Sequence, residues 1–588
     1  MAGVVFNKVD YTLLNLLSHI EMGIIGLPDI QRPFVWGNTK VRDLFDSMYR
    51  GFPVGYLLFW ENGAADGHKQ IGLDRKQIVP SLLIVDGQQR LTCLYAVMRG
   101  VPVLRQDFKR ERLRIAFRPS DQTFEVTDAA VELDPEYIPD ISQLWASDKP
   151  YHVLVNEFLA RLRRHREVTQ EEENRLWEAI ARLQNLREYP FTALQLSQAV
   201  SEEEVAEVFV RINSRGTPLN QADFILTLMS VFWDEGRKEL ECFCRDARQP
   251  TLGKPSPFNY FIQPAPDQLL RASVALGFRR ARLQHVYSIL RGKDLDTEEF
   301  SEERRVQQFA VLEKAQDYVL NLLNWHDFFA VLTHAGYRSN HMITSQLGLM
   351  YTYALFLIGK RDYGVDHHAL RNVIARWFFM SALTARYTDS PESAMEQDLA
   401  RLRDAHGPAD FVHILDRTIE SVLTGDYWDV TLPAMLATSS ARTPSLYAYH
   451  AALNLLEAKA LFSEIRVSDF LEPAIHAGKS PVERHHLFPR GYLEKQGIRE
   501  TRDVNQIANY ALVEWPDNAD ISDTPPAEYF PKYAQKFSSD DLAAMRYWHA
   551  LPEGWENMAY SDFLEARRKL MAHVIRDAFQ RLRKTEPG

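Results

Sequence analysis

Cysteine is scarce in this chain, and long apolar runs are absent. Three cysteines occur, Cys93, Cys242 and Cys244, which are too few for a disulfide scaffold and fit a reducing cytoplasm. Cys242 and Cys244 have no second cysteine pair, so a zinc site is not expected there. No stretch approaches about 18 uninterrupted apolar residues, which argues against a membrane span. Residues 1–17 lack the basic start and apolar run of a signal peptide.

A basic surplus is also missing, because the formal net charge is −11. Proteins that bind nucleic acids usually carry excess positive charge. Contact with phosphates nevertheless needs only a local patch. Basic runs occur at residues 161–166, 279–282 and 567–569, and each is more typical of a solvated helix face than of a nucleic-acid contact.

The composition is that of an ordinary globular protein, with 46% hydrophobic and 25% charged residues. The length of 588 residues suggests three or four domains at about 150 residues each. The hydrophobic patterns predict an α+β protein that is predominantly α-helical. They mix strands and helices up to about residue 130, become mostly helical over 150–235 and all-helical over 268–435, turn to short strands over 480–526, and return to helix over 538–584.

Two breaks in the pattern guide the domain boundaries. Residues 249–267 carry five prolines and indicate a connector, and the stretch TSSARTPS at 438–445 indicates a second boundary. We therefore expect domains at 1–250, 251–440 and 441–535, followed by a helical segment at 536–588.

The first candidate site lies at Asp86-Gly87-Gln88-Gln89-Arg90, between a strand pattern and a helix pattern. Gly87 permits a sharp reversal, and the free N–H groups of the following helix favour an anion. The guanidinium of Arg90 can bind an anion through two hydrogen bonds. The two glutamines can form hydrogen bonds to a base, sugar or phosphate, and Asp86 can bind a metal or accept from a ribose hydroxyl. The alternative is a polar turn whose side chains only cap the helix.

Two further segments combine arginine, amide side chains and turn residues. The first segment, residues 29–36, reads DIQRPFVW and contains Gln31 and Arg32. The third segment, residues 209–219, reads FVRINSRGTPL, contains Arg211 and Asn213, and is followed by Asp223. For each segment the alternative is a salt-bridged surface turn.

Together, IQRPFVW, VDGQQRLT and FVRINSRGTPLNQADFILT resemble the N-terminal domain of the GmrSD family of modification-dependent (type IV) restriction enzymes. This resemblance implies a ParB/sulfiredoxin-like fold and binding and hydrolysis of a nucleoside triphosphate, ATP or GTP. It implies a nucleotide site at Asp86, Gly87, Gln88, Gln89 and Arg90, joined by Gln31, Arg32, Arg211 and Asn213. No Walker A pattern occurs, so a P-loop site is not expected.

The second candidate site combines His485 and His486, a proline three residues later, Asn509 and Asn518. Cleavage of a phosphodiester needs a base to activate water, a role that suits histidine, and a metal to stabilise the leaving oxygen. The spacing fits a ββα-metal (HNH) finger in which the first strand carries the histidines. The alternative is a polar hairpin with surface histidines.

The pattern is also similar to the C-terminal HNH domain that accompanies DGQQR domains in the GmrSD family. The resemblance implies that His486 is the general base, that His485 and Asn518 hold the metal, and that Asn509 orients the loop and the base. Adjacent residues on a strand face opposite sides, so the histidines share one site only if the strand ends or bulges there. Arg484 and Arg490 are candidates to grip the scissile phosphate, or are simply solvated.

These observations predict a nucleotide-responsive, metal-dependent endonuclease of the cytoplasm that uses Mg²⁺ or Mn²⁺. Its expected substrate is double-stranded DNA, with modified phage DNA as the target in bacterial defence. Three alternatives remain: a nucleotide-hydrolysing regulator whose finger only binds DNA, a non-enzymatic interaction protein, and an RNA-directed nuclease. The long apolar helical faces fit a homodimer interface or the core, and the core is the better explanation.

Overall fold

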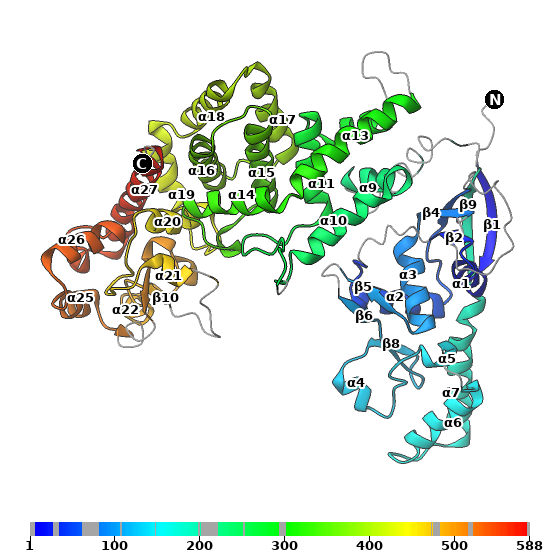
Figure 1. The fold of residues 1–588 in the computed structure, drawn as a ribbon. Coiled ribbons are helices and arrows are strands. Elements are labelled where there is room, and N and C mark those ends of the chain that lie inside the picture. The colour runs from blue at the N-terminus through cyan, green and yellow to red at the C-terminus, as the bar shows by residue number, and fades with distance from the viewer. Residues whose placement is uncertain are drawn as a thin grey trace. The chain divides into compact units, whose positions relative to one another are not determined.

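The computed structural model describes residues 6–26, 34–61, 81–105, 109–146, 149–197, 200, 208, 221–250, 253–292, 301–471, 473, 482–514 and 521–584. The chain divides into two compact units, Met1–Asn220 and Gln221–Gly588, which run from blue to cyan-green and from green to red in Figure 1. The first unit contains a mixed sheet and helices, and the second is mainly helical. No described helix is long and apolar enough to cross a membrane.

A five-stranded sheet forms the centre of the first unit. Its strand order is β1-β9-β3-β4-β2, with β1/β9 and β3/β4 antiparallel and β9/β3 and β4/β2 parallel. Its strands are β1 (Phe6–Thr12), β2 (Ile25–Gly26), β3 (Leu57–Glu61), β4 (Leu82–Asp86) and β9 (Pro190–Leu196). Strands β3 and β4 fall within the N-terminal stretch, up to about residue 130, in which the sequence predicts strands mixed with helices. Strand β9 falls where the sequence pattern predicts mostly helix.

Helices and two small hairpins complete this unit. Its described helices are α1 (Leu13–Glu21), α2 (Asn38–Tyr49), α3 (Gln88–Arg99), α4 (Ala129–Leu133), α5 (Gln143–Ala146), α6 (Tyr151–Leu162) and α7 (Gln170–Gln184). The hairpins are β5 (Pro102–Leu104) with β6 (Arg110–Arg112), and β7 (Ile115–Arg118) with β8 (Thr123–Val126). Helix α3 buries Leu91, Leu94 and Met98 in a core shared with α1 and α2. That burial fixes the direction in which α3 leaves β4.

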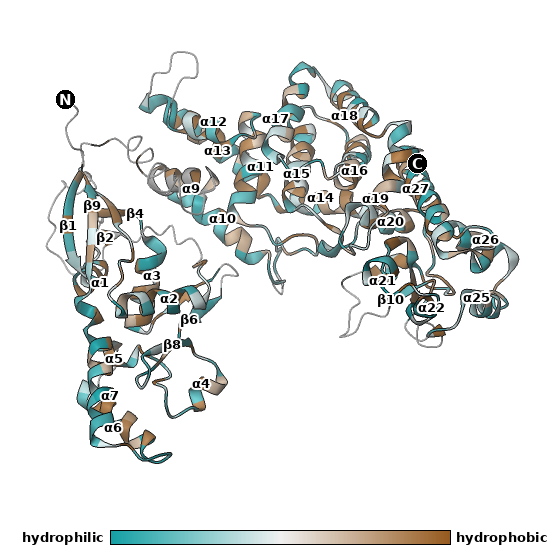
Figure 2. Ribbon diagram, turned by 180° about the vertical axis from the view of Figure 1, so that it is seen from behind, coloured by the Kyte–Doolittle hydropathy of each residue, from teal (hydrophilic) through white to brown (hydrophobic). Residues whose placement is uncertain are grey.

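The second unit begins with a long series of helices. They are α9 (Gln221–Phe232), α10 (Asp234–Asp246), α11 (Pro266–Phe278), α12 (Leu283–Leu290), α13 (Glu302–Val319), α14 (Leu322–His334), α15 (Gln346–Arg361), α16 (His367–Leu383), α17 (Pro391–Arg401), α18 (Pro408–Val422) and α19 (Leu432–Met435). Helices α9 and α10 pack against α11 and belong to this unit, whereas the sequence-based boundary at residue 250 falls after α10. Helix α15 is buried along nearly its whole length, and its apolar residues appear brown in Figure 2.

The C-terminal part of this unit contains a two-stranded hairpin surrounded by helices. The strands are β10 (Val482–His486) and β11 (Tyr510–Glu514). The helices are α20 (Pro444–Leu455), α21 (Val467–Leu471), α22 (Arg490–Lys495), α23 (Thr501–Val504), α25 (Pro526–Ala534), α26 (Ser539–Trp548) and α27 (Tyr560–Lys584). Helix α27 packs against α16 and α20 and also contacts the short 3-10 helix Ile507–Asn509 that precedes β11. One helix therefore connects the helical layer to the hairpin.

Candidate functional site

The segment Asp86 to Arg90, named here the DGQQR turn, joins the end of β4 to the start of α3. Gly87 adopts a φ of 96°, a left-handed conformation that glycine reaches without steric strain. A Cβ atom at Gly87 would lie 2.3 Å from Cδ2 of Leu57. The glycine is therefore required both by the backbone conformation and by the close approach of β3.

Arg90 holds the neighbouring backbone together. Its Nη1 donates to the carbonyl of Val54 at 2.7 Å, and its Nη2 donates to the carbonyl of Tyr56 at 2.7 Å and to the Asp86 carboxylate at 3.2 Å. A Cβ atom at Gly55, where φ is 91°, would lie 2.6 Å from Nη1. Burial lowers the pKa of the Arg90 guanidinium, and the Asp86 carboxylate opposes that shift. The Arg90 guanidinium therefore uses its hydrogen bonds mainly to hold the neighbouring backbone in place.

The first segment reaches the DGQQR turn through its last residues. The backbone N–H of Val35 donates to Oε1 of Gln89 at 3.1 Å, and the N–H of Phe34 donates to the carbonyl of Leu104 at 2.7 Å. The structure thus brings two of the three predicted segments together. Of the residues assigned to this pocket, Gln31, Arg32, Arg211 and Asn213 lie outside the described residues, and Gln88 is half-buried at the first position of α3.

The second predicted site centres on the hairpin of β10 and β11, named here the HH hairpin. The two strands pair in register from Val482↔Glu514 to His486↔Tyr510 without a bulge. His486 is the last residue of β10. Both histidines therefore lie within the regular ladder, and their side chains point to opposite faces of the hairpin.

The two histidine rings have different neighbours. His485 is 2% exposed, and its ring packs edge-on against Tyr529 of α25 at 5.8 Å between centroids. His486 is half-buried, its ring lies 4.5 Å from that of Tyr510, and its Nε2 lies 3.0 Å from Oδ1 of Asn505. The His485 ring thus packs against a helix, whereas the His486 ring contacts the polar side chain of Asn505 at the end of the strand.

Asn509 is fully buried and ties three backbone groups together. Its Oδ1 accepts from the N–H of Phe488 at 2.9 Å, and its Nδ2 donates to the carbonyls of Phe488 and Val504 at 3.1 Å each. Phe488 lies two residues beyond His486, so these bonds fix the loop that leaves the strand. Asn518 lies outside the described residues, as does the side chain of Arg484, and Arg490 is exposed and donates to Glu494 at 2.9 Å.

Comparison with known proteins places a family likeness on the first unit. Residues 13–230 match the family model of the N-terminal domain of GmrSD restriction endonucleases. The matched range contains the DGQQR turn and both companion segments, and it ends before the HH hairpin. An uncharacterized protein of Methanocaldococcus jannaschii is 22% identical over 553 residues, which are 88% of this chain and 86% of that protein. That likeness runs through both units.

Two residues near the HH hairpin are not predicted from the sequence, Asn505 and Arg567. Asn505, the partner of His486, lies 19 residues away in the sequence, and no local spacing points to it. Arg567 of α27 is fully buried, and it donates from Nη1 to the carbonyl of Ala508 at 2.7 Å and from Nε to the carbonyl of His549 at 3.1 Å. The basic run at 567–569 was interpreted as a solvated helix face, which is wrong for its first member.

The signal for Arg567 was present in the sequence. Phe563 and Met571 lie four residues before and after it, and both are fully buried. Arg567 therefore occupies a position on the apolar stripe of α27, since residues at i, i+4 and i+8 share a helix face. A charged residue at such a position is a signal for a buried polar contact.

The other basic runs are engaged within their own units. Arg166 donates to Glu136 and Glu172, which raise its pKa. Arg279 pairs with Asp362, and Arg280 pairs with Glu396. Both runs therefore contribute to the fold. The run at 279–282 lies between α11 and α12, so the expectation of a solvated helix face is wrong for it.

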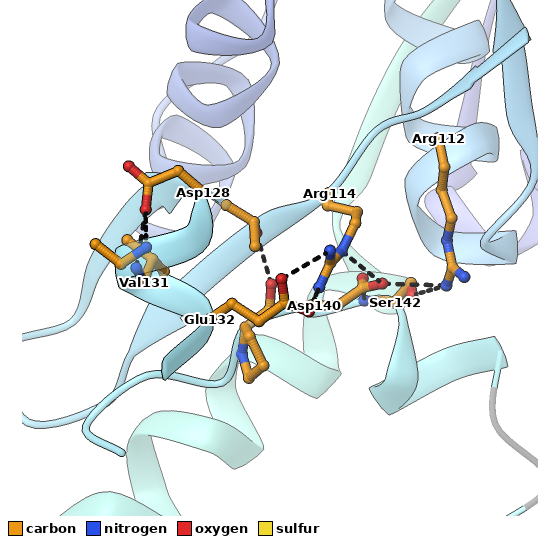
Figure 3. A network of polar contacts seen from close by, with 10 residues as sticks. Arg112, Arg114, Asp128, Val131, Glu132, Asp140 and Ser142 are labelled. Atoms are coloured by element: carbon orange, nitrogen blue, oxygen red, sulfur yellow. Dashed lines mark hydrogen bonds and ion pairs between the residues drawn. The ribbon is translucent and has the colours of Figure 1, made fainter. Parts of the chain in front are cut away.

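A network of ion pairs also links Arg112 and Arg114, at and just after the end of β6, to Asp140. Figure 3 shows Arg112 and Arg114 turned toward Asp140. Nη2 of Arg112 lies 3.1 Å from the Asp140 carboxylate and donates to Oγ of Ser142 at 3.0 Å. Arg114 also pairs with Glu132 at 2.8 Å. The Asp140 carboxylate is nearly buried, so these arginines compensate a charge that water cannot reach.

Proposed function

We propose that this chain is a DNA endonuclease of the restriction type whose first unit binds and hydrolyses a nucleoside triphosphate. The observation that carries the proposal is the match of residues 13–230 to the N-terminal domain of GmrSD restriction endonucleases. We assign DNA cleavage to the HH hairpin, and the role of each of its residues is argued from its position there. The substrate is double-stranded DNA, and modified phage DNA is the preferred target.

His486 suits the role of general base. It lies at the end of β10, half-buried beside Tyr510, with one ring nitrogen held by an amide oxygen. A base must be fixed in orientation yet able to reach a water molecule. Asn509 supports this position because it fixes the backbone two residues further along.

In the proposed reaction, His486 takes a proton from a water molecule whose oxygen attacks phosphorus. The new P–O bond forms as the bond from phosphorus to the 3′ oxygen breaks in line. The bonding pair leaves with the 3′ oxygen, which then takes a proton from solvent. The products are a 5′ phosphate and a 3′ hydroxyl, and the histidine returns its proton to solvent.

The metal requirement rests on residues that the described chain contains only in part. No three His, Cys, Asp or Glu side chains come together as a metal site within the described ranges. His485 would offer an imidazole nitrogen from the buried face of β10, opposite to His486, and Asn518, outside those ranges, would offer an amide oxygen. The amide oxygen would suit Mg²⁺ or Mn²⁺, whereas the imidazole would suit Mn²⁺ better than Mg²⁺. We propose that phosphate oxygens of the DNA complete the site. When bound, such an ion supplies positive charge that stabilises the leaving oxygen.

The nucleotide is assigned to the DGQQR turn at the N-terminus of α3. Gln88 and Gln89 supply amide groups, and the first N–H groups of α3 favour a phosphate. Arg90 acts mainly by shaping the turn, because its guanidinium is bonded to two carbonyls and to Asp86. Gln31, Arg32, Arg211 and Asn213 remain proposed members of the same pocket.

The test is a cleavage assay with purified protein, plasmid and phage DNA, Mg²⁺ or Mn²⁺, and ATP or GTP. His486→Ala is expected to abolish cleavage. His573→Ala changes a histidine whose side chain is 63% exposed on α27 and is expected to cleave like the wild type. Cleavage by His486→Ala at the wild-type rate would overturn the assignment of the base.

The nucleotide site is tested in the same assay. Gln88→Ala is expected to lose the response to nucleotide, whereas Gln170→Ala, an exposed amide on α7, is expected to keep it. Loss of cleavage in the wild type under all conditions, with DNA binding retained, would favour a regulator whose hairpin only binds DNA. Cleavage that is insensitive to EDTA would exclude the metal.

A further inference from the structure

The contact between His486 and Asn505 determines which ring nitrogen carries the hydrogen. Oδ1 of Asn505 lies 3.0 Å from Nε2 of His486. An amide oxygen can only accept, so Nε2 must donate. In the neutral ring the lone pair is then on Nδ1, because the hydrogen bond made by one nitrogen sets the state of the other.

The position of Asn505 is itself well supported. It follows α23, and its backbone N–H donates to the carbonyl of Thr501 at 2.9 Å. The preceding carbonyl, that of Val504, accepts from Nδ2 of Asn509 at 3.1 Å and from the hydroxyl of Tyr560 at 3.2 Å. The amide that meets His486 is thus carried by backbone that both the HH hairpin and α27 hold.

We propose that Asn505 is the positioning residue of His486, and that it fixes the imidazole in the tautomer and orientation that present Nδ1 to the attacking water. The consequence for catalysis rests on the proposed nuclease function, whereas the tautomer itself does not. Asn505 would act through His486, whose Nε2 its amide oxygen contacts at 3.0 Å. Without it, the ring can rotate and present either nitrogen.

The direct test is the nitrogen spectrum of the full chain labelled with ¹⁵N at histidine, recorded in alkaline buffer where the ring is neutral. The His486 signals are identified by their loss in His486→Ala. The wild type is expected to show one tautomer, with the hydrogen on Nε2. Asn505→Leu is expected to show a mixture, and Asn505→Asp, which keeps an acceptor at the same place, is expected to retain the single tautomer.

The cleavage assay provides the second readout. Asn505→Leu is expected to lower kcat about 10- to 100-fold, as the loss of supporting hydrogen bonds does elsewhere, with KM little changed. Asn505→Asp is expected to restore most of kcat. The matched control is Gln506→Leu, which removes the neighbouring amide, whose Nε2 donates to the carbonyl of Arg502 at 2.9 Å. It is expected to leave both readouts unchanged.

Two results would overturn the inference. One is an unchanged tautomer in Asn505→Leu, and the other is an equal loss of kcat in Gln506→Leu. If the wild type cleaves no nucleic acid, the proposed function fails, but the tautomer comparison still decides the role of Asn505. Equal unfolding temperatures of Asn505→Leu and Asn505→Asp would show that a difference between them does not come from misfolding.

Discussion

The DGQQR turn and the HH hairpin are both held by side-chain hydrogen bonds to the backbone, but the side chains that form these bonds differ in charge. In each, one residue of the motif holds the backbone on which the others stand. In the turn that residue is Arg90, a cation bonded to the carbonyls of Val54 and Tyr56. In the hairpin it is Asn509, a neutral amide bonded to Phe488 and Val504.

The difference follows from burial. The Arg90 side chain retains 14% exposure and has the Asp86 carboxylate beside it, so its charge is partly compensated. Asn509 is completely buried, where an uncompensated charge would be unfavourable and an amide can satisfy donors and acceptors together. A motif therefore contains residues that hold the fold as well as residues that are candidates for chemistry.

The largest expected effect is that of Asn509→Ala. It leaves the N–H and carbonyl of Phe488 without their side-chain partners in a dry interior, so we expect a loss of about 4 kcal/mol in the free energy of unfolding of the second unit. Urea unfolding followed by tryptophan fluorescence measures it. Gln506→Ala is the control, with an expected change within about 0.5 kcal/mol. Equal losses in both variants would remove the basis of the comparison.

Acid is expected to weaken the support of the hairpin through His549. This residue is fully buried, its Nε2 lies 3.0 Å from the carbonyl of Lys459, and burial lowers its pKa from 6.5 to about 4. The unfolded chain therefore binds the proton first, so stability is complete above about pH 6.5 and is lost as the pH falls toward 4.

The loss due to His549 amounts to about 3.5 kcal/mol at most, since each unit of pKa difference corresponds to about 1.4 kcal/mol. Unfolding measured from pH 7 to 4 should show this slope in the wild type and a flatter one in His549→Gln. His573→Gln, on the surface of α27, should retain the wild-type slope. The contacts described for Arg90 include no histidine, so the turn should not share this dependence.

A smaller effect is expected for Arg90→Met. Two carbonyls lose their donor at a site that water can partly reach, so we expect a loss of about 2 kcal/mol in the first unit. Arg90→Lys should not restore it, because an ammonium group lacks the planar fork that reaches both carbonyls. Arg50→Met, which breaks an exposed pair with Asp46, should leave stability nearly unchanged. A full recovery in Arg90→Lys would contradict the role given to the fork.

The smallest effect on stability is expected for Gln88→Ala, within about 0.5 kcal/mol. The informative measurement is thermal unfolding with and without nucleotide. Saturating nucleotide should stabilise the wild type by about 2.7 kcal/mol at a hundredfold excess over Kd, and this gain should vanish in Gln88→Ala. If the gain persists, Gln88 belongs with Arg90 among the residues that serve the fold, and the nucleotide lies elsewhere.

Sequence patterns predict the elements whose signals lie within a short stretch of the chain. The strand and helix on either side of Gly87 follow from a buried apolar run, a turn residue and a 3.6-residue period, and the short strands expected over residues 480–526 include both strands of the HH hairpin. Strand β9 could not be found in this way. It pairs with β1 and β3, which lie more than 100 residues earlier, and its own seven residues begin with a proline beside a helical pattern.

The same limit applies to the candidate site. Both histidines and Asn509 could be named because their spacing belongs to one hairpin. Asn505 meets His486 only after the loop between the strands has folded back, and Arg567 meets Ala508 from a helix 59 residues away. Contacts of this kind depend on how helices dock, which no single-sequence period records.

The position of α27 also sets the order in which the hairpin can be completed. A ribosome makes both strands and His486 before it makes Tyr560 and Arg567, whose side chains bond the carbonyls of Val504 and Ala508. A nascent chain that ends before α27 therefore has every residue of the proposed nuclease chemistry but lacks the groups that hold the hairpin in position. Because α27 is synthesised after both strands, the proposed catalytic residues are made before the two side chains that hold their backbone, and the hairpin gains these supports only after synthesis has passed Arg567.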